Sequence, residues 1–324
     1  MKAIVHHEYG SPDDVLELQE TDKPMVKANE VLVRVRAASV NPYDWHFVTG
    51  LPYFARIQFG LLKPKTSGLG ADLAGQVEAV GGTVTRIQPG DEVFGEVATG
   101  GFAEYVCVAE EAVAPRPGNL TFEQAASVPM AALTALQGLR DQGRIQPGHK
   151  ALINGASGGV GTFAVQIAKS FGADVTGVCS SRNMDMVRSI GADHVIDYTH
   201  EDFTRGEPRY DVMLDLVGNH SPSECRRVLT RKGVYVASFG RPEHRWLGPL
   251  AQLLRMLLLS PFVSQTLATF VARTTEEDLH FLKGLIEAGK VTPVIDRTYP
   301  LSNVPEAIRY LEEGHARGKV AITV

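Results

Sequence analysis

A glycine-rich run at Gly155–Gly161, with the sequence GASGGVG, carries the clearest chemical signal in the chain. It follows an apolar stretch, Lys150–Asn154, and precedes a helical pattern, Thr162–Phe171. Strand, glycine turn and helix in this order bind the pyrophosphate of a dinucleotide, because glycine lets backbone N–H groups approach the phosphates and the helix N-terminus adds partial positive charge. A turn with only a structural role is the alternative. The pattern predicts a dinucleotide site at Ser157, Gly158, Gly159 and Val160.

The residues after the next predicted strand, Asp174–Cys179, indicate which dinucleotide binds. An acidic residue about 20 positions beyond the glycine turn would hold the ribose hydroxyls of NAD. The sequence there reads Ser180-Ser181-Arg182-Asn183, and hydroxyls with a guanidinium suit a 2′-phosphate. We therefore expect NADPH as the cofactor, bound by Ser180, Arg182 and Asn183. Ser181 or Asn183 could instead cap the following helix.

The elements around these residues predict two domains. From residue 122 onward, strands alternate with helical stretches of ten or more residues, which indicates βαβ units and a parallel sheet. Residues 1–121 contain short β-rich runs separated by Gly and Pro, which favour an antiparallel β domain. The tail returns to this first domain. We expect an α/β protein in which a doubly wound domain at 122–272 is inserted into a β-rich domain formed by 1–121 and 273–324.

Composition excludes several classes of protein. The 324 residues carry 32 Lys and Arg against 37 Asp and Glu, a net charge of −5, which argues against a nucleic-acid partner. The three cysteines, Cys107, Cys179 and Cys225, are too few and too far apart for a disulfide framework or a CxxC ligand pair. The N-terminus shows no signal-peptide pattern. These features favour a cytoplasmic location.

The most apolar segment, Trp246–Val263, contains Gln252, Arg255 and two prolines. It falls short of the roughly 20 apolar residues that span a bilayer, so no transmembrane helix is expected. An apolar helix at 246–259 is predicted instead. A buried or partner-facing helix is favoured, and a cover over the substrate or a membrane-surface contact remains an alternative.

Five motifs together resemble one family. They are Ser39-Val40-Asn41-Pro42-Tyr43-Asp44, Gly68–Gly75 with the sequence GLGADLAG, Pro89-Gly90-Asp91-Glu92-Val93, the Gly155–Gly161 turn and Gly318-Lys319-Val320. Over nearly the whole chain the sequence resembles the zinc-free quinone oxidoreductase branch of the medium-chain dehydrogenase/reductase (MDR) superfamily. The resemblance implies a GroES-like catalytic domain and a Rossmann cofactor domain.

The same resemblance predicts that no zinc is bound. In the zinc-dependent relatives, a Cys ligand stands at the position of Asn41 and a His ligand at the position of Ala71. Neither an amide nor a methyl group replaces a thiolate or an imidazole as a zinc ligand. The four-cysteine lobe that holds structural zinc in these relatives is also absent.

Without a metal ion, hydride addition to a quinone or an α,β-unsaturated carbonyl is the expected reaction, because conjugation spreads the incoming charge. Asn41 is the first candidate to donate a hydrogen bond to the developing oxyanion, and the resemblance also implies that it contacts the coenzyme; an Asn-Pro turn that caps its own loop is the alternative. Tyr43, His46 and Tyr53 are expected on the loop that follows. Tyr43 and Tyr53 are candidates to line the site as donors.

Further contacts are implied by matching positions. Thr134 resembles a helix residue near the nicotinamide, Tyr198 a residue near the adenosine phosphate, and Lys319 a tail residue that returns to the site. Ser238, Phe239 and Gly240 would end a strand beside the carboxamide. The alternatives are helix packing for Thr134, a core position for Tyr198 and a surface charge for Lys319.

The predicted function is an NADPH-dependent, metal-free reduction of quinones or conjugated enals and enones. Two alternatives remain open: an NADPH-binding structural protein without turnover, as crystallin-like family members suggest, and an enoyl-thioester reductase. A predicted edge strand, Thr266–Val271, favours a homodimer, since family members often pair such edges.

Overall fold

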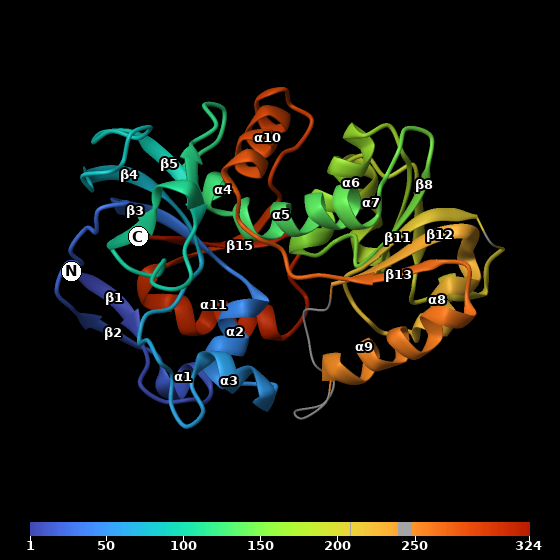
Figure 1. Cartoon of the computed structure of the whole chain (residues 1–324), viewed down its shortest axis with the longest axis horizontal. Helices are drawn as coiled ribbons and strands as arrows, with labels where there is room; N and C mark the ends of the chain where they lie inside the picture. The colour runs from blue at the N-terminus through green and yellow to red at the C-terminus, as the bar shows by residue number, and fades with distance from the viewer. Residues whose placement is uncertain (208, 239–247) are drawn as a thin grey trace. The chain divides into compact units, whose positions relative to one another are not determined.

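The computed structural model describes residues 1–207, 209–238 and 248–324 (Figure 1). Its contacts divide the chain into two units. The first comprises Met1–Leu133, Thr274–Ala288 and Pro293–Val324, and the second comprises Thr134–Arg273 and Gly289–Thr292. The first boundary lies at 133/134, later than the 121/122 expected from the sequence, because α4 (Phe122–Ala126) packs on the sheet of the first unit.

A seven-stranded sheet forms the first unit, in the order β14-β15-β3-β4-β5-β7, with β6 paired to β3 and a separate β1-β2 pair. β14 and β15 run parallel, and the other pairs of this sheet are antiparallel. The strands are β1 (Lys2–Val5), β2 (Glu17–Glu20), β3 (Glu30–Val40), β4 (Asp72–Val80), β5 (Glu92–Glu96), β6 (Tyr105–Ala109), β7 (Val113–Pro115), β14 (Ile295–Pro300) and β15 (Lys319–Thr323).

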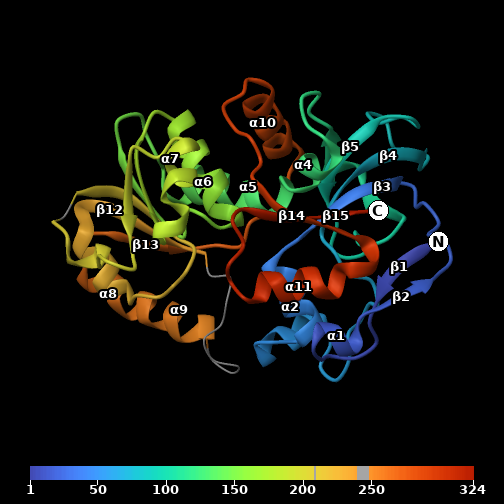
Figure 2. The same ribbon diagram turned by 180° about the vertical axis from the view of Figure 1, so that it is seen from behind.

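Two apolar cores hold this unit together. One is formed largely by valines, which include Val31, Val33 and Val35 at alternate positions of β3, so that their side chains share one face of the sheet. The other lies under α11 and α2, which lie side by side (Figure 2). The helices are α1 (Pro12–Val15), α2 (Pro42–Thr49), η1 (Tyr53–Ala55), α3 (Arg56–Phe59), η2 (Glu110–Ala112), α4, α10 (Glu276–Glu287), η8 (Leu301–Asn303) and α11 (Val304–Glu312). α5 (Pro129–Gln137) spans the boundary between the units.

The second unit contains a six-stranded parallel sheet in the order β10-β9-β8-β11-β12-β13. The strands are β8 (Lys150–Asn154), β9 (Asp174–Cys179), β10 (His194–Asp197), β11 (Tyr210–Asp215), β12 (Leu229–Ala237) and β13 (Thr266–Thr269). Chain order reverses between β8 and β11, which is the topological switch point at which this fold binds ligands. The doubly wound parallel sheet expected from the sequence is therefore confirmed.

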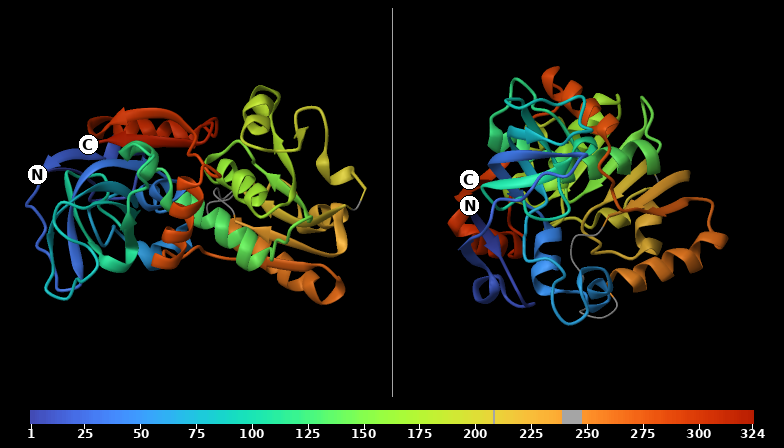
Figure 3. Two further views of the ribbon diagram at one scale, coloured as in Figure 1. Left: turned by 90° about the horizontal axis from the view of Figure 1, so that it is seen from above. Right: turned by 60° about the vertical axis from the view of Figure 1, so that its left-hand side comes forward.

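Helices cover both faces of this sheet, with α6 and α7 on one side and α8 and α9 on the other (Figures 1 and 3). Buried side chains of α6 pack on β8 and β9. The helices are η3 (Gly138–Gln142), α6 (Gly159–Ser170), η4 (Ser181–Asn183), α7 (Met184–Ser189), η5 (Phe203–Arg205), α8 (Pro222–Cys225), η6 (Arg226–Val228), α9 (Gly248–Leu259) and η7 (Ser260–Phe262).

The predicted loop after Asn41 is wrong, because α2 begins directly after that residue. Pro42 occupies the first helical turn, where its missing N–H costs nothing, and the Asp44 side chain accepts from the backbone N–H of Asn41. Tyr43 and His46 therefore lie on a helix, and Tyr53 lies on η1. The Asn-Pro pair was interpreted as a turn signal, although the same residues also start helices.

The apolar helix predicted at 246–259 begins at Gly248 as α9; residues 246 and 247 lie outside the described residues. Met256 is buried in the core of the second unit. Leu254, Leu257 and Leu258 are exposed, so this face of α9 is not buried within the chain as described. Within those described residues, no helix has both the length and the hydropathy needed to cross a membrane.

Candidate active site

Three polar residues that lie far apart in the sequence meet at one edge of the first unit's sheet. Asn41 directly follows β3, Asp72 starts β4 and Lys319 starts β15. Strand register brings them together, since Ser39 of β3 pairs with Asp72, and Val40 pairs with Val320, which follows Lys319. All three are buried, with Lys319 only 3% exposed and Asp72 fully enclosed.

The ammonium group of Lys319 has three acceptors. Its Nζ lies 2.5 Å from Oδ1 of Asn41, 3.3 Å from Oδ2 of Asp72 and 3.3 Å from the carbonyl oxygen of Val40. A lysine can donate three hydrogen bonds, so each of its donors has a partner. The prediction of Lys319 as a residue that returns to the site is consistent with this burial, and the surface-charge alternative is wrong.

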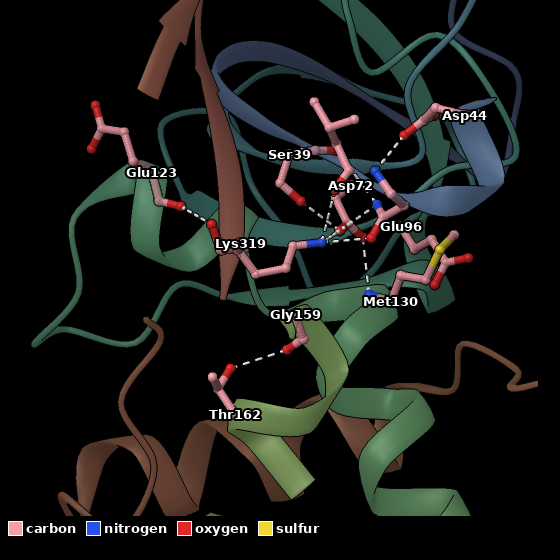
Figure 4. Close-up of polar contacts among 12 residues, drawn as sticks. Ser39, Asp44, Asp72, Glu96, Glu123, Met130, Gly159, Thr162 and Lys319 are labelled. Atoms are coloured by element: carbon pink, nitrogen blue, oxygen red, sulfur yellow. Dashed lines mark hydrogen bonds and ion pairs between the residues drawn. The ribbon is translucent and has the colours of Figure 1, made fainter. Parts of the chain in front are cut away.

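Asp72 is held by four donors in addition to its neighbours in the sheet (Figure 4). Its Oδ2 accepts from Ser39 Oγ at 2.7 Å, from Asn41 Nδ2 at 2.9 Å and from Lys319, while Oδ1 accepts from the backbone N–H of Met130 at 2.9 Å. A buried ion pair is stable only when its remaining donors and acceptors are also satisfied, and this one meets that condition. We call Ser39, Asn41, Asp72 and Lys319 the buried lysine network.

The amide of Asn41 is oriented by this network. Oδ1 faces the Lys319 ammonium, and Nδ2 donates to Asp72 and, at a longer 3.4 Å, to the carbonyl oxygen of Ser39. Asp44 accepts from the backbone N–H of Asn41 at 2.7 Å, so this carboxyl stabilises the start of α2. Both N–H groups of the amide have protein acceptors, and the bond to Ser39 is the weaker one.

Two further carboxyls, those of Asp44 and Glu96, lie beside the buried lysine network. Burial raises the pKa of Asp44 to about 7, with the negative charge of Asp72 acting in the same direction. Burial likewise raises the pKa of Glu96 to about 7, and the charge of Asp72, its cross-strand partner, adds to this effect. Glu96 also accepts from Thr274 Oγ1 at 2.7 Å. The site therefore contains two carboxyls that exchange protons near neutral pH.

The two predicted tyrosines lie among aromatic side chains. Tyr43 stacks on Phe47 at 6.0 Å between ring centroids and meets Phe59 edge-on, and its hydroxyl donates to the carbonyl oxygen of Ala98 at 3.2 Å. Burial raises the pKa of Tyr43 to about 12, so the phenol is protonated at neutral pH. The guanidinium carbon of Arg56 lies over the Tyr53 ring, 4.9 Å from the ring centroid. Neither ring belongs to the buried lysine network.

The glycine turn of the second unit has little space for side chains at two positions. Gly155 has a φ of +87°, which favours glycine, and a methyl group at Gly161 would overlap the carbonyl oxygen of Gly155. At Gly158 a methyl group would meet nothing closer than 3.5 Å. Gly158 lies directly before the N-terminus of α6, whose first N–H groups have no intrahelical acceptor. This geometry fits a pyrophosphate at Ser157, Gly158, Gly159 and Val160.

Three of the predicted coenzyme contacts lie together. Asn183 Nδ2 donates to Ser157 Oγ at 3.0 Å and lies 3.4 Å from Ser180 Oγ, so the glycine turn is tied to the residues that follow β9. Asn183 makes no side-chain capping bond to α7, and its Oδ1 is buried without a partner among the described atoms. A buried acceptor of this kind suits a ligand donor. Arg182 is exposed on η4.

The remaining predicted contacts are placed as follows. Thr134 lies half-buried on α5. Tyr198 follows β10 and is 57% exposed, so its core alternative is wrong. Ser238 follows β12, and its N–H donates to the carbonyl oxygen of Asp215. Phe239 and Gly240 lie outside the described residues.

Sequence analysis missed Asp215, which organises the strand ends of the second unit. The carboxylate accepts from Asn154 Nδ2 at 2.8 Å, from the Tyr235 hydroxyl at 2.7 Å and from the N–H groups of Val217 and Gly218. It also missed Ser39, Asp72 and Glu96 in the first unit. Ser39 and Asp72 lie in two of the motifs quoted above, but their contact with each other depends on the pairing of strands, which has no local sequence signal.

Family models match both halves of the chain. "Alcohol dehydrogenase GroES-like domain" matches residues 27–118, and "Zinc-binding dehydrogenase" matches residues 190–322. A GroES-like domain combined with a Rossmann domain defines the MDR superfamily. The fold class predicted from the sequence is therefore confirmed.

Relatives are similar over the full length. The mouse (Mus musculus) "NAD(P)H oxidoreductase RTN4IP1, mitochondrial" is 36% identical over 100% of this chain and 89% of its own. The Arabidopsis thaliana "NADPH-dependent alkenal/one oxidoreductase, chloroplastic" is 34% identical over 99% of this chain and 79% of its own. The crystal structure of Escherichia coli quinone oxidoreductase complexed with NADPH has a TM-score of 0.86 at 27% identity, covering 100% of both chains. The chain belongs to the quinone oxidoreductase branch of the MDR superfamily, and the resemblance seen in the sequence is confirmed.

Proposed function

We propose that this protein is an NADPH-dependent, metal-free oxidoreductase that reduces quinones or α,β-unsaturated carbonyls. The observation that carries the proposal is the Gly155–Gly161 turn before the N-terminus of α6, in which a side chain at Gly161 would overlap the Gly155 carbonyl oxygen, whereas one at Gly158 would come no closer than 3.5 Å to another atom. A nicotinamide cofactor fits this turn. The names of the mouse, Arabidopsis and Escherichia coli relatives support both the cofactor class and the acceptor class.

When bound, the reduced nicotinamide supplies a hydride that adds to the electron-poor carbon of the acceptor. In our proposal Ser157 and the first turn of α6 bind the pyrophosphate, and Ser180, Arg182, Asn183 and Tyr198 bind the adenosine 2′-phosphate side. Thr134, Ser238, Phe239 and Gly240 are assigned to the nicotinamide side. These assignments are carried over from the sequence and stay proposals.

The acceptor oxygen is assigned to Asn41. Lys319 and Asp72 fix the amide plane, and the Asn41 N–H that lies 3.4 Å from the Ser39 oxygen is the donor most easily exchanged for a ligand oxygen. Glu96 holds a proton near pH 7 and is the proposed store for the proton that the product oxygen needs. Tyr43 and Tyr53 are proposed to line the acceptor site.

The absence of a zinc ligand set supports the metal-free part of the proposal. Ala71 is buried and has no donor atom, and the Asn41 oxygen already accepts from Lys319. Among the residues with described positions, no three His, Cys, Asp or Glu side chains form a group that could hold a metal ion. The residues whose positions the structure describes therefore do not fit the zinc implied by the name of the second family model.

Two other sequence-based expectations stay proposals. β13 pairs only with β12 among the described strands, so its free edge could pair with that of a second copy in a homodimer. The cytoplasmic location expected from the sequence is also a proposal. The names of the mouse and Arabidopsis relatives place those proteins in organelles.

The test measures loss of NADPH absorbance with a naphthoquinone, a 2-alkenal and an enoyl thioester as separate acceptors. We expect oxidation with the first two and a much smaller rate with the thioester. Asn41→Ala should keep NADPH binding and lower turnover by about 10²-fold, the typical cost of losing one oxyanion donor. Coenzyme binding without oxidation by any acceptor would favour the structural alternative, and a preference for the thioester would favour an enoyl-thioester reductase.

A further inference from the structure

A carboxylate that sequence analysis did not consider lies beside the predicted 2′-phosphate segment. Asp197, at the end of β10, accepts a short hydrogen bond from Ser181 Oγ through Oδ2. Its Oδ1 accepts from the backbone N–H of Thr199 at 3.0 Å and from Thr199 Oγ1 at 2.7 Å. The Ser181 and Thr199 hydroxyls lie 3.1 Å apart. Three donors near the expected ribose position are thus directed at one carboxylate.

The parallel pairing of β9 and β10 brings this acid into place. Asp197 is in register with Cys179, the last residue of β9, and Ser181 begins two residues later on η4. Parallel strands end at the same edge of a sheet, where this fold binds ligands. Asp197 belongs to the neighbouring strand, β10, and not to the segment that directly follows β9, where the acid of an NAD-binding motif is expected.

The hydrogen bonds decide which groups this position can bind. The Ser181 and Thr199 hydroxyls donate to Asp197, so each offers only lone pairs to a ligand. A 2′-phosphate has no carbon-bound hydroxyl to donate and needs donors or positive charge, whereas a free ribose 2′-hydroxyl can donate to these oxygens or to the carboxylate itself. The Ser181 hydrogen bond lowers the pKa of Asp197 to about 2, so the group is charged at any working pH.

A positive group nearby acts in the opposite direction. Arg182 is exposed on the same η4 turn as Ser181. A guanidinium binds phosphate well, and it attracts the 2′-phosphate that the carboxylate repels. The coenzyme preference is therefore set by two opposed charges and not by Arg182 alone.

We infer that Asp197 is a specificity-determining residue that weakens the binding of NADPH relative to NADH and so keeps the protein able to use both coenzymes. The inference rests on the proposed function, since it assumes that a nicotinamide dinucleotide binds at the end of β9. Asp197 acts on the ribose end of the coenzyme through its charge and by holding the Ser181 hydroxyl.

The test compares the dissociation constants of NADPH and NADH, measured by calorimetric titration with no acceptor present, for the wild-type protein and Asp197→Asn. Asparagine keeps an oxygen that can accept from Thr199 and removes the charge. We expect NADPH to bind about 3- to 10-fold more tightly, as expected for removing one like charge at a partly solvated site, and NADH to bind equally or more weakly.

The matched control is Asp185→Asn. Asp185 is an exposed carboxylate on α7 that pairs with Arg188, so this variant loses the same charge from the same unit without touching the strand ends. It should leave the ratio of the two dissociation constants unchanged. An equal rise in NADPH affinity in both variants would mean that net charge, and not the position of Asp197, sets the preference, and would overturn the inference.

A double-mutant cycle tests the hydroxyl directly. Ser181→Ala should change NADPH affinity little in the wild-type background, because the hydroxyl proton is held by Asp197, and should cost about 3-fold in the Asp197→Asn background. Additive effects would overturn the inference. Failure of the wild-type protein to bind either coenzyme would instead refute the proposed function, so the two failures are distinguishable.

Discussion

Replacing Asp44 with asparagine tests the electrostatics around the buried lysine network. The replacement keeps an oxygen that can accept the hydrogen bond from the backbone N–H of Asn41. Asp44 is fully buried, Oδ2 accepts from the N–H of Asn41, and Oδ1 has no partner among the described atoms. Asparagine keeps an oxygen for Asn41 and replaces a group that becomes negative near neutral pH by a neutral one. We expect Asp44→Asn to be more stable than the wild type at pH 8.

The magnitude follows from the change in pKa, from an ordinary 3.8 to about 7. Between about pH 4 and pH 7, Asp44 keeps its proton in the folded state and has lost it in the unfolded state. The free energy of unfolding that Asp44 contributes below about pH 4 is therefore lost as the pH rises toward about 7. At about 1.4 kcal/mol per tenfold change in the ionisation constant, the full loss is about 4 kcal/mol. Between pH 5 and pH 8 the part that remains to be lost is about 2 to 3 kcal/mol.

The assay is urea unfolding at pH 5 and pH 8, followed by tryptophan fluorescence. The chain has two tryptophans, so a Trp246→Phe background leaves Trp45, next to Asp44 on α2, as the reporter. The difference in the free energy of unfolding between Asp44→Asn and the protein that keeps Asp44 should shift in favour of the variant by about 2 to 3 kcal/mol from pH 5 to pH 8. Asp14→Asn, an exposed site on α1, is the control and should show no such rise. Equal destabilisation of Asp44→Asn at both pH values would refute the reasoning.

Three further predictions concern single positions. Lys319→Met should lower the free energy of unfolding by about 3 to 5 kcal/mol in chemical denaturation, because Asp72 would stay buried without its ion-pair partner, and adding Asp72→Asn should restore part of the loss. Gly161→Ala should abolish coenzyme binding in titration, since the added methyl group would overlap the Gly155 carbonyl oxygen. Gly284→Ala is the control and should bind normally, because a methyl group there would have no other atom within 4 Å. Arg182→Ala should raise the KM for NADPH and leave that for NADH almost unchanged in steady-state assays; equal losses for both coenzymes would contradict the 2′-phosphate assignment.

Local signals predicted the second unit well. The strand, glycine turn and helix at 150–171 are adjacent in the sequence, and each has its own pattern, so β8 and α6 were predicted with their order and relation. The same holds for the parallel strands, whose apolar runs alternate with helices. The start of α2 was missed because Asn41-Pro42 has two meanings, a turn and a helix N-terminus.

The polar network could not be predicted in the same way. Lys319 and Asp72 are separated by most of the chain, and their contact depends on the register of β15 on β3 and of β3 on β4. Asp197 reaches Ser181 through the pairing of β9 and β10. Register is set by burial and by neighbouring strands, and neither is visible in a single local segment. The resemblance to a family directed attention to Asn41 and Lys319, and the structure supplied Asp72 and Ser39 as their partners.

The central claim is direct, metal-free transfer of hydride from NADPH to a conjugated acceptor. The decisive measurement reduces a 2-alkenal with NADPH deuterated at C4, on each face in turn, using protein whose metal content has been determined after chelation. We predict deuterium on the β-carbon of the product from one of the two deuterated coenzymes. The rate should be the same before and after chelation, with far less than one metal ion per chain remaining. Product without deuterium from either coenzyme, or activity that is lost on chelation and restored by zinc, would contradict the account.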